Sequence, residues 1–403
     1  MLAVLLLAWC AAAQQPPVLP PAVDTKDEAF EKVDPYTKGD SAAMDRAGYV
    51  SFGPFLFAQG VKTQDVEEAL GLQQVLWVET AHFKLGSTLK TYKFRGDQRE
   101  EKRFKEELAR LKPRFEKFTP PRGKLDPWLR VHLFALRLEE LYADFQRRFS
   151  LTDGDFDVTK RAPGGPNFGT GAFLGMPNKF TVLLLEKESG LVRFGKRFLN
   201  QEPKAFVRWQ LGGSMLLVVT GDGVRGFGYD LESAMTCMVL SEATHNLVDG
   251  FRGTWSSCPL WFKYGLAHGV SRRIDERWTI SALGTTREFG DDSWKWEPRL
   301  ARLLANGFVK EWDDILGWAK WDDIKPQGHM LAWSRVEWLL ENEACDPRAL
   351  LVELCAPATN LDDSTRGAFY VQRSRTALEK ACGRTLAELD AAWREHVART
   401  YPK

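Results

Sequence analysis

The chain has 403 residues, 44% of them hydrophobic, which is enough for one large domain or two ordinary ones with a sizeable core. Its 55 lysine and arginine residues nearly balance its 54 aspartate and glutamate residues, so the formal net charge is +1. This balance removes the main electrostatic argument for nucleic acid or an anionic membrane surface as a partner, because both require a basic face.

The first residues are expected to form an export signal over positions 1–13. Residues 1–9 are an apolar run, and the small residues that follow it are those a signal peptidase prefers before Gln14. The run is too short to span a bilayer, and no later segment has the length of a transmembrane helix. We therefore expect an exported protein of the periplasm, the cell envelope or the extracellular space. Lipid attachment at Cys10 is disfavoured because Trp9 stands where a small residue is expected.

Residues 14–71 are rich in Pro, Gly, Ala and Asp with little periodicity, which predicts a tether followed by an irregular N-terminal extension. An α/β subdomain is expected over residues 72–230. Its expected strands are 75–78, 82–85, 180–185 and 214–220, and its expected helices are 99–118, one that begins after the N-cap Asp126, and 189–199. The glycine- and proline-rich stretch 154–177 is expected to be a loop.

From Leu231 onward every expected element is helical, so residues 231–403 are assigned to a helical C-terminal subdomain. The sequence thus predicts an α+β fold, in which a small mixed sheet subdomain precedes a mostly helical one. The helix of residues 238–249 lies at the seam between them. Near the C-terminus we expect a helix that stops at Gly383 and a second helix capped by Thr385.

Five cysteines follow the predicted signal, at positions 237, 258, 345, 355 and 382. An odd number in an exported chain leaves at least one thiol without an intramolecular partner. Cys345, Cys355 and Cys382 lie in one helical region where one disulfide is expected, and the sequence leaves the pair open. The sequence has no CxxC spacing, so a structural zinc knuckle is not expected.

The main chemical motif is Ser241-Glu-Ala-Thr-His245, which is HExxH with serine in place of the first histidine. Residues four apart share one face of a helix, so HExxH directs two imidazoles at one zinc ion and leaves the glutamate to activate water. Zinc catalysis needs three protein ligands and one open position for water. Here His245 is the only standard ligand at that spacing, because a serine hydroxyl does not ionise readily near neutral pH.

On these residues the chain resembles the gluzincins, the thermolysin-like metallopeptidases of the MA clan, and particularly their bacterial exported "peptidase MA-like" branch. In that branch HExxH is followed by Pro-x-Trp-[Leu/Phe]-x-Glu-Gly-Leu-Ala, whose glutamate is the third zinc ligand. This chain has Pro259-Leu-Trp-Phe-Lys-Tyr-Gly-Leu-Ala267, with Tyr264 at the position of the glutamate. The resemblance implies a gluzincin-like fold with the HExxH helix at the seam.

The resemblance also implies a role for each matching position. Glu242 matches the general base and His245 the second zinc ligand. Asp249 matches an aspartate that orients the first histidine. His329, in a helix that resembles the family's Tyr-Ala-Gln-Ser helix, falls where relatives have tyrosine, which makes it a candidate oxyanion donor. Glu242 and His245 are thus vestigial, and we expect them to form a satisfied polar pair inside the helix.

Because Ser241 and Tyr264 replace two of the three ligands, the first hypothesis is a pseudopeptidase without catalytic zinc that binds or scaffolds a peptide or protein. The second is a divergent metal-dependent hydrolase whose site uses Glu242, His245 and His329, with His268 as a further candidate. Glu242, His245 and Asp249 are expected on one helix face, and with His268 they form a set able to bind a divalent ion. The third is a cell-envelope glycan or peptide binder that uses the tryptophans between Trp294 and Trp338, of which Trp296 is the one to test. The oligomeric state is left open.

One further motif, Gly221-Asp-Gly-Val-Arg-Gly226, matches the GxGxxG dinucleotide fingerprint. A Rossmann unit needs a second strand after the helix, whereas here only helices are expected to follow, so we predict a glycine-rich turn instead. In the resembled family the preceding strand borders the substrate cleft. We therefore expect Leu216, Val218 and Thr220 to lie on an edge that a peptide can extend by strand addition.

Overall fold

The computed structural model describes residues 31–116, 118–119, 122–156, 171–211, 213–226, 231–253, 258–278, 294–343, 345–356, 358, 362 and 364–402. The predicted export signal with Cys10, residues 14–30 of the predicted extension and the middle of the predicted loop lie outside these ranges. Among the described residues, no helix combines the length and the apolar character needed to cross a membrane.

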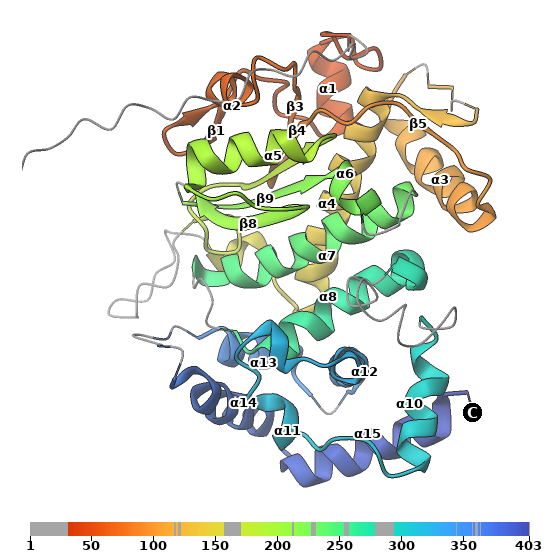
Figure 1. The fold of residues 1–403 in the computed structure, drawn as a ribbon, viewed down its shortest axis with the longest axis vertical. Helices are drawn as coiled ribbons and strands as arrows, with labels where there is room; N and C mark the ends of the chain where they lie inside the picture. Colours follow the sequence, from red (N-terminus) through yellow and green to blue (C-terminus); the bar gives the residue numbers. More distant parts are fainter. Residues whose placement is uncertain are drawn as a thin grey trace, which may run out of the picture.

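The architecture of the described residues is α+β, as predicted, with one five-stranded sheet followed by helices (Figure 1). The sheet has the strand order β3-β4-β7-β9-β8, with β3 at Leu76–Glu79, β4 at Phe83–Ser87, β7 at Phe180–Leu185, β8 at Phe206–Leu211 and β9 at Ser214–Thr220. The three central strands are parallel to one another, and both outer strands are antiparallel to their neighbours. Every described element after β9 is helical.

The central strands form where the sequence is continuously apolar. Every residue of β7 and β9 is buried, which is the pattern of strands covered on both faces. Leu183 and Val218 pack on one side, with α2 (Thr63–Ala69) and α5 (Glu188–Phe194). The alternate residues of the two strands belong to the main core, which also includes α4 (Pro127–Arg148) and α7 (Glu232–Gly250). The N-cap of α4 is Asp126, as predicted, since its carboxylate accepts from the Leu129 amide.

The described part of the N-terminal extension is more regular than the sequence suggested. It contains α1 (Ser41–Ala47), the hairpin of β1 (Leu56–Ala58) and β2 (Val61–Lys62), and α2. Phe57 and Val66 are fully buried in the smaller core cluster beside the sheet. These short elements bury at most three side chains each, which leaves no periodic signal in the sequence.

The predicted helix at 99–118 is shorter than expected, because α3 spans Gln98–Leu111 and Pro113 then lies in a separate turn. A two-stranded pairing of β5 (Tyr92–Lys93) with β6 (Lys124–Leu125) flanks it. The GxGxxG segment is a short helix, α6 (Gly221–Gly226), and not the predicted turn. Residues 189–199, predicted as one helix, are α5 continued by a π-helical segment to Leu199.

The C-terminal part consists of helices packed around α8 (Leu260–Asp275), which contacts α7 on one side and α12 (Pro326–Glu341) on the other. A β-carbon at Gly265 of α8 would lie 2.4 Å from the carbonyl oxygen of Ala332, so glycine permits this close approach. The remaining helices are α10 (Trp296–Ala305), α11 (Asp313–Leu316), α13 (Pro347–Leu354), α14 (Arg366–Cys382) and α15 (Leu386–Thr400).

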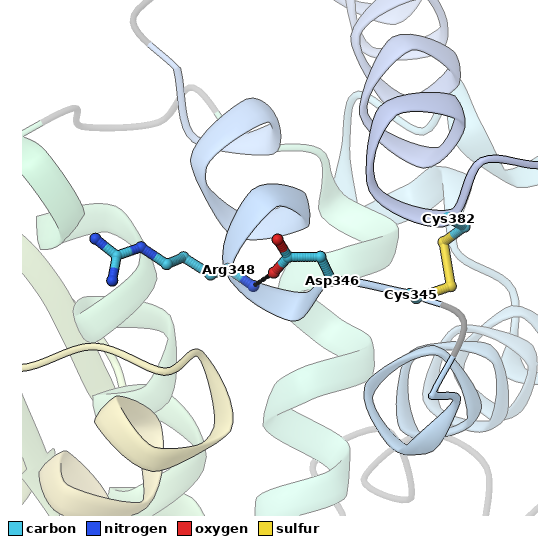
Figure 2. The surroundings of a disulfide bond; sticks show 4 residues. All are labelled: Cys345, Asp346, Arg348 and Cys382. Carbon is cyan, nitrogen blue, oxygen red and sulfur yellow. Dashed lines mark hydrogen bonds between the residues drawn. A yellow bond between two sulfur atoms is a disulfide. The ribbon is translucent and has the colours of Figure 1, made fainter.

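A disulfide joins Cys345, just before α13, to Cys382 at the end of α14 (Figure 2). This bond resolves the pairing that the sequence left open, and Cys355 is buried and takes no part in a disulfide. Asp346, beside the bond, caps α13 by accepting from the Arg348 amide. As predicted, α14 stops at Gly383, whose φ of 63° is left-handed, and Thr385 caps α15.

Candidate functional site at the junction of α7, α8 and α12

The residues of the degenerate HExxH motif lie in the second half of α7. This helix is buried along its whole length, because β9, α4 and α8 all pack against it. A helix buried all round is normally apolar, so each polar side chain on it needs a partner inside the protein. Glu242 and Asp249 meet this requirement, whereas His245 does not.

Arg208 of β8 contacts two of the three carboxylates of α7, those of Glu242 and Asp249. Its Nε lies 2.7 Å from Oε2 of Glu242, and its Nη1 donates to Oδ2 of Asp249 over 2.8 Å. The two acids are seven residues, or two helical turns, apart and thus share one face, which the guanidinium fork spans. Lys263 of α8 is a second partner of Asp249. Two cations therefore balance two carboxylates whose side chains are only 5% and 2% exposed.

The electrostatics of these groups follow from burial and from the pairs they form. Burial raises the pKa of Glu242, although Arg208 opposes the shift. Burial alone would also raise the pKa of Asp249, but Lys263 and Arg208 outweigh it and hold that pKa below its usual range. The pKa of Arg208 is raised, because the two carboxylates together outweigh its desolvation. Asp249 is therefore firmly ionised, whereas Glu242 depends on Arg208 for its charge.

His245 is not part of a satisfied pair with Glu242, which corrects the expectation from sequence. Both of its ring nitrogens are buried, and neither has a hydrogen-bond partner among the described residues. Its ring packs edge-on against Tyr264, with 4.7 Å between the ring centroids. Burial, together with the charges of Arg208 and Lys263, lowers the pKa of His245 well below 6.5. The imidazole is therefore neutral at physiological pH.

His268 and His329 contact each other instead of joining the acids of α7. Nε2 of His268 lies 2.9 Å from Nδ1 of His329, between α8 and α12. Burial lowers the pKa of His329 to about 3, and it lowers the pKa of His268 well below the usual value. Both rings are thus neutral, and one donates the proton that the other accepts. Within the described ranges, no group of three or more His, Cys, Asp or Glu residues is arranged to hold a metal ion.

Tyr264 connects these groups through its ring. It makes edge contacts with His245, with His329 at 5.7 Å and with Trp321 at 5.0 Å between centroids. Burial raises the pKa of the Tyr264 hydroxyl, so the phenol stays protonated. Trp321 is 45% exposed, so this aromatic cluster reaches the protein surface.

The zinc ion that the family resemblance implies does not fit these residues. Of the three ligand positions only His245 offers a good donor, since Ser241 has a hydroxyl and Tyr264 a protonated phenol. Arg208 and Lys263 already provide two positive charges beside the acids of α7. A divalent cation at the same place would be repelled by both, and the low dielectric of the interior strengthens that repulsion.

The predicted substrate edge is wrong, because β9 lies between β7 and β8. Leu216, Val218 and Thr220 are fully buried, and the backbone of β9 is paired on both sides. The outer strand is β8, which sequence reasoning missed together with Arg208. The alternation of Phe206, Arg208 and Gln210 with apolar neighbours was the available signal for an edge strand.

The tryptophans do not form the surface platform considered from the sequence. Trp296, Trp312 and Trp318 are at most 6% exposed and belong to the core. Trp321 is the exposed member of this group, and sequence reasoning did not single it out.

Comparison of the chain with protein-family models, with curated proteins and with solved structures gives no match.

Proposed function

We propose that this chain is a gluzincin-like pseudopeptidase, exported from the cell, that acts as a binding or scaffolding protein. The observation that carries the proposal is the position of Arg208, whose guanidinium contacts the residue at the general-base position and the aspartate two turns beyond it. In a working enzyme of this type a metal ion activates water beside the glutamate. Here the positive charge beside the glutamate is that of the Arg208 guanidinium.

This arrangement is unsuited to general-base chemistry. A general base must have a lone pair within hydrogen-bond reach of the proton it removes. The Oε2 atom of Glu242 is engaged by Arg208, and the carboxylate is 5% exposed. Neutral His245 and protonated Tyr264 supply no charge that would polarise a substrate carbonyl. The ion pairs that Glu242 and Asp249 form with Arg208 and Lys263 therefore support a role in holding β8, α7 and α8 together rather than a role in catalysis.

The surface beside the network offers contacts for a peptide or protein ligand. Trp321 is 45% exposed and packs on Tyr264, and the Arg208 side chain is 20% exposed. Tryptophan and arginine are both among the residue types enriched where protein interfaces bind most strongly. We expect Trp321→Ala to weaken ligand capture without changing the fold.

Restoring the ligands tests the proposal directly. The double variant Ser241→His with Tyr264→Glu rebuilds the family's ligand set but keeps Arg208 beside the acids. The triple variant with Arg208→Met also removes one of the two competing charges and keeps Lys263. We expect the unaltered protein to hold less than one zinc per chain, the double variant to gain little, and the triple variant to bind zinc at least tenfold more tightly than the double variant, about 1.4 kcal/mol or more.

His245→Ala added to the triple variant is the matched control, and it should remove the gained affinity. Metal content is measured by elemental analysis of purified protein, and unfolding curves confirm that each variant is folded. One zinc per chain in the unaltered protein, with peptide hydrolysis that chelators and Glu242→Gln both abolish, would establish the hydrolase hypothesis instead.

A further inference from the structure

Two cysteine thiols contact each other in the core of the helical C-terminal part. Cys258 lies immediately before Pro259, the N-cap of α8, and Cys355 is the C-cap residue of α13. One thiol donates a hydrogen bond to the other. Cys258 is 2% exposed and Cys355 is fully buried, and both belong to the main core. The fold therefore brings together two sulfur atoms that are far apart in the sequence.

Arg373 of α14 provides independent evidence that the two sulfur atoms are neighbours. Burial lowers the pKa of this arginine, and both Cys355 and Cys258 oppose the shift, so the guanidinium lies near both thiols. Arg373 also donates to the carbonyl oxygen of Ala356, the residue after Cys355. A cation beside a thiol favours the thiolate, which is the form that attacks a disulfide. The two cysteines thus share one environment that suits this chemistry.

The remaining cysteine of the helical part has different partners. Cys237 of α7 is fully buried, and its thiol donates to the carbonyl oxygens of Ser271 and Asp275 on α8. Both contacts are with backbone oxygen atoms, which cannot form a bond with sulfur. Five cysteines follow the predicted signal, so two disulfides and one remaining thiol account for all of them. Cys237 is the cysteine expected to remain a thiol.

We propose that Cys258 and Cys355 form a second disulfide while the chain folds. A disulfide such as Cys345–Cys382 persists in an oxidising compartment, where a second pair of adjacent thiols is oxidised as well. The Cys345–Cys382 bond holds the start of α13 against the end of α14 (Figure 2). The second bond holds the end of α13 against the start of α8, so that α13 is fixed at both ends.

This second bond also stabilises the ion pairs of the candidate site. The first turns of α8 carry Lys263, which pairs with Asp249 of α7. A covalent bond directly before α8 limits the movement of this end of the helix. It also closes a loop of about 100 residues, and a cross-link over such a loop strongly restricts the unfolded chain. The inference does not depend on whether the protein is a pseudopeptidase.

The reaction is a thiol–disulfide exchange in which a small external disulfide, such as oxidised glutathione, is the oxidant. The thiolate of one cysteine attacks the external disulfide, forms a mixed disulfide and releases one thiol. The thiolate of the other cysteine then attacks the protein sulfur of the mixed disulfide and releases the second thiol. Two cysteine thiols thereby lose two electrons and two protons, and one external disulfide is reduced to two thiols. Burial raises the pKa of Cys258 well above its ordinary value, so the exchange takes place before the core closes around this thiol.

Peptide mapping of the refolded full chain tests the proposal. The reduced, unfolded chain is refolded in a buffer of reduced and oxidised glutathione, quenched with acid, and alkylated in denaturant. Mass spectrometry should show the Cys258 peptide joined to the Cys355 peptide, with the loss of two hydrogen atoms, together with the Cys345–Cys382 bond and an alkylated Cys237. The proposal is overturned if Cys258 and Cys355 are both recovered as alkylated thiols, or if either is joined to another cysteine.

A stability measurement separates the bond from simple packing. In oxidised protein, Cys355→Ala should raise the equilibrium constant for unfolding by at least about thirtyfold relative to the unaltered chain. In chains refolded with reductant, the same substitution only truncates a buried thiol, and its effect should be much smaller. Cys237→Ala is the matched control, because it truncates a fully buried thiol and should have the same effect in both conditions. An equal effect of Cys355→Ala in oxidised and reduced protein would overturn the proposal. Neither experiment involves zinc, so both are independent of the restored-ligand variants.

Discussion

The charged residues near the two ends of α7 are of the same types but differ in burial. At the C-terminal end, Glu242 and Asp249 are matched by Arg208 and Lys263, and the acids are almost completely buried. Near the N-terminal end, an open pocket lies at the carboxyl ends of the parallel strands, and Arg225, which lines it and is 39% exposed, pairs with Glu186 and Asp222. Breaking a buried pair leaves an uncompensated charge inside the protein, whereas water screens a partly exposed pair.

Removing an arginine from each region should show the difference most strongly. Arg208→Met leaves Glu242 without its partner and Asp249 with Lys263 alone. We expect a loss of about 3 kcal/mol in the free energy of unfolding, the lower end of the range for breaking a buried pair, because Glu242 can take up a proton. Arg225→Met removes two partly exposed pairs, with Glu186 and with Asp222, and should cost about 1 kcal/mol.

Both free energies are measured by urea unfolding at neutral pH. Glu242→Gln combined with Arg208→Met provides a further check, because the neutral amide removes the uncompensated charge. Part of the stability lost in Arg208→Met should return in that double variant. Equal losses for Arg208→Met and Arg225→Met would contradict the distinction between a buried balanced network and an open pocket.

Two glycines of α6, beside the pocket, provide a smaller effect that tests how closely this helix packs. Gly223→Ala would place a β-carbon 2.4 Å from the Ala205 backbone, and we expect a loss of about 2 kcal/mol in the free energy of unfolding. Gly226→Ala meets no atom within 4 Å and should change stability by less than about 0.5 kcal/mol. Thermal unfolding measures both. A large cost at Gly226, or none at Gly223, would show that the backbone of α6 is arranged differently.

The parts of the fold that the sequence predicted well are those fixed by local patterns. The strands at 180–185 and 214–220 have the predicted bounds, because continuous apolar runs identify strands buried on both faces. The caps at Asp126 and Thr385 depend on residues three positions away along the chain. Such contacts can be inferred from spacing alone, and the α+β class follows from the order of the elements they define.

The parts that could not be predicted depend on contacts between distant residues. The departures from HExxH at Ser241 and from the resembled motif at Tyr264 are visible in the sequence. The pairing of Arg208 with Asp249 is not, because Arg208 is 41 positions from Asp249 and lies on an edge strand. Lys263 is beside Tyr264 in the motif, yet its partner becomes evident only when α7 and α8 are packed together. The pocket likewise needs the carboxyl ends of β4, β7 and β9 to be brought side by side.

The weakest expected effect is a pH dependence that originates in the histidines beside the balanced network. Burial lowers the pKa of His329 to about 3, compared with 6.5 for an unperturbed histidine. As the pH falls below about 6.5, the unfolded chain binds a proton that the folded state excludes, so stability decreases toward acid pH and is fully present above that value. His329→Gln should reduce the slope of unfolding free energy by about 1 kcal/mol per pH unit between about pH 6 and pH 5.

His82 offers a control of opposite sign. Burial would lower its pKa, but Glu139 and Asp153 outweigh that effect and raise it, so the folded state retains the His82 proton to higher pH than the unfolded chain does. The stabilisation from His82 is therefore present at acid pH and is lost as the pH rises through its folded pKa. Between about pH 6.5 and its raised folded pKa, His82→Gln should make the loss of stability on acidification steeper, whereas His329→Gln makes that loss shallower below about pH 6.5. If both variants changed the slope in the same direction, the response would reflect net charge, and the neutral buried histidine pair would not be its origin.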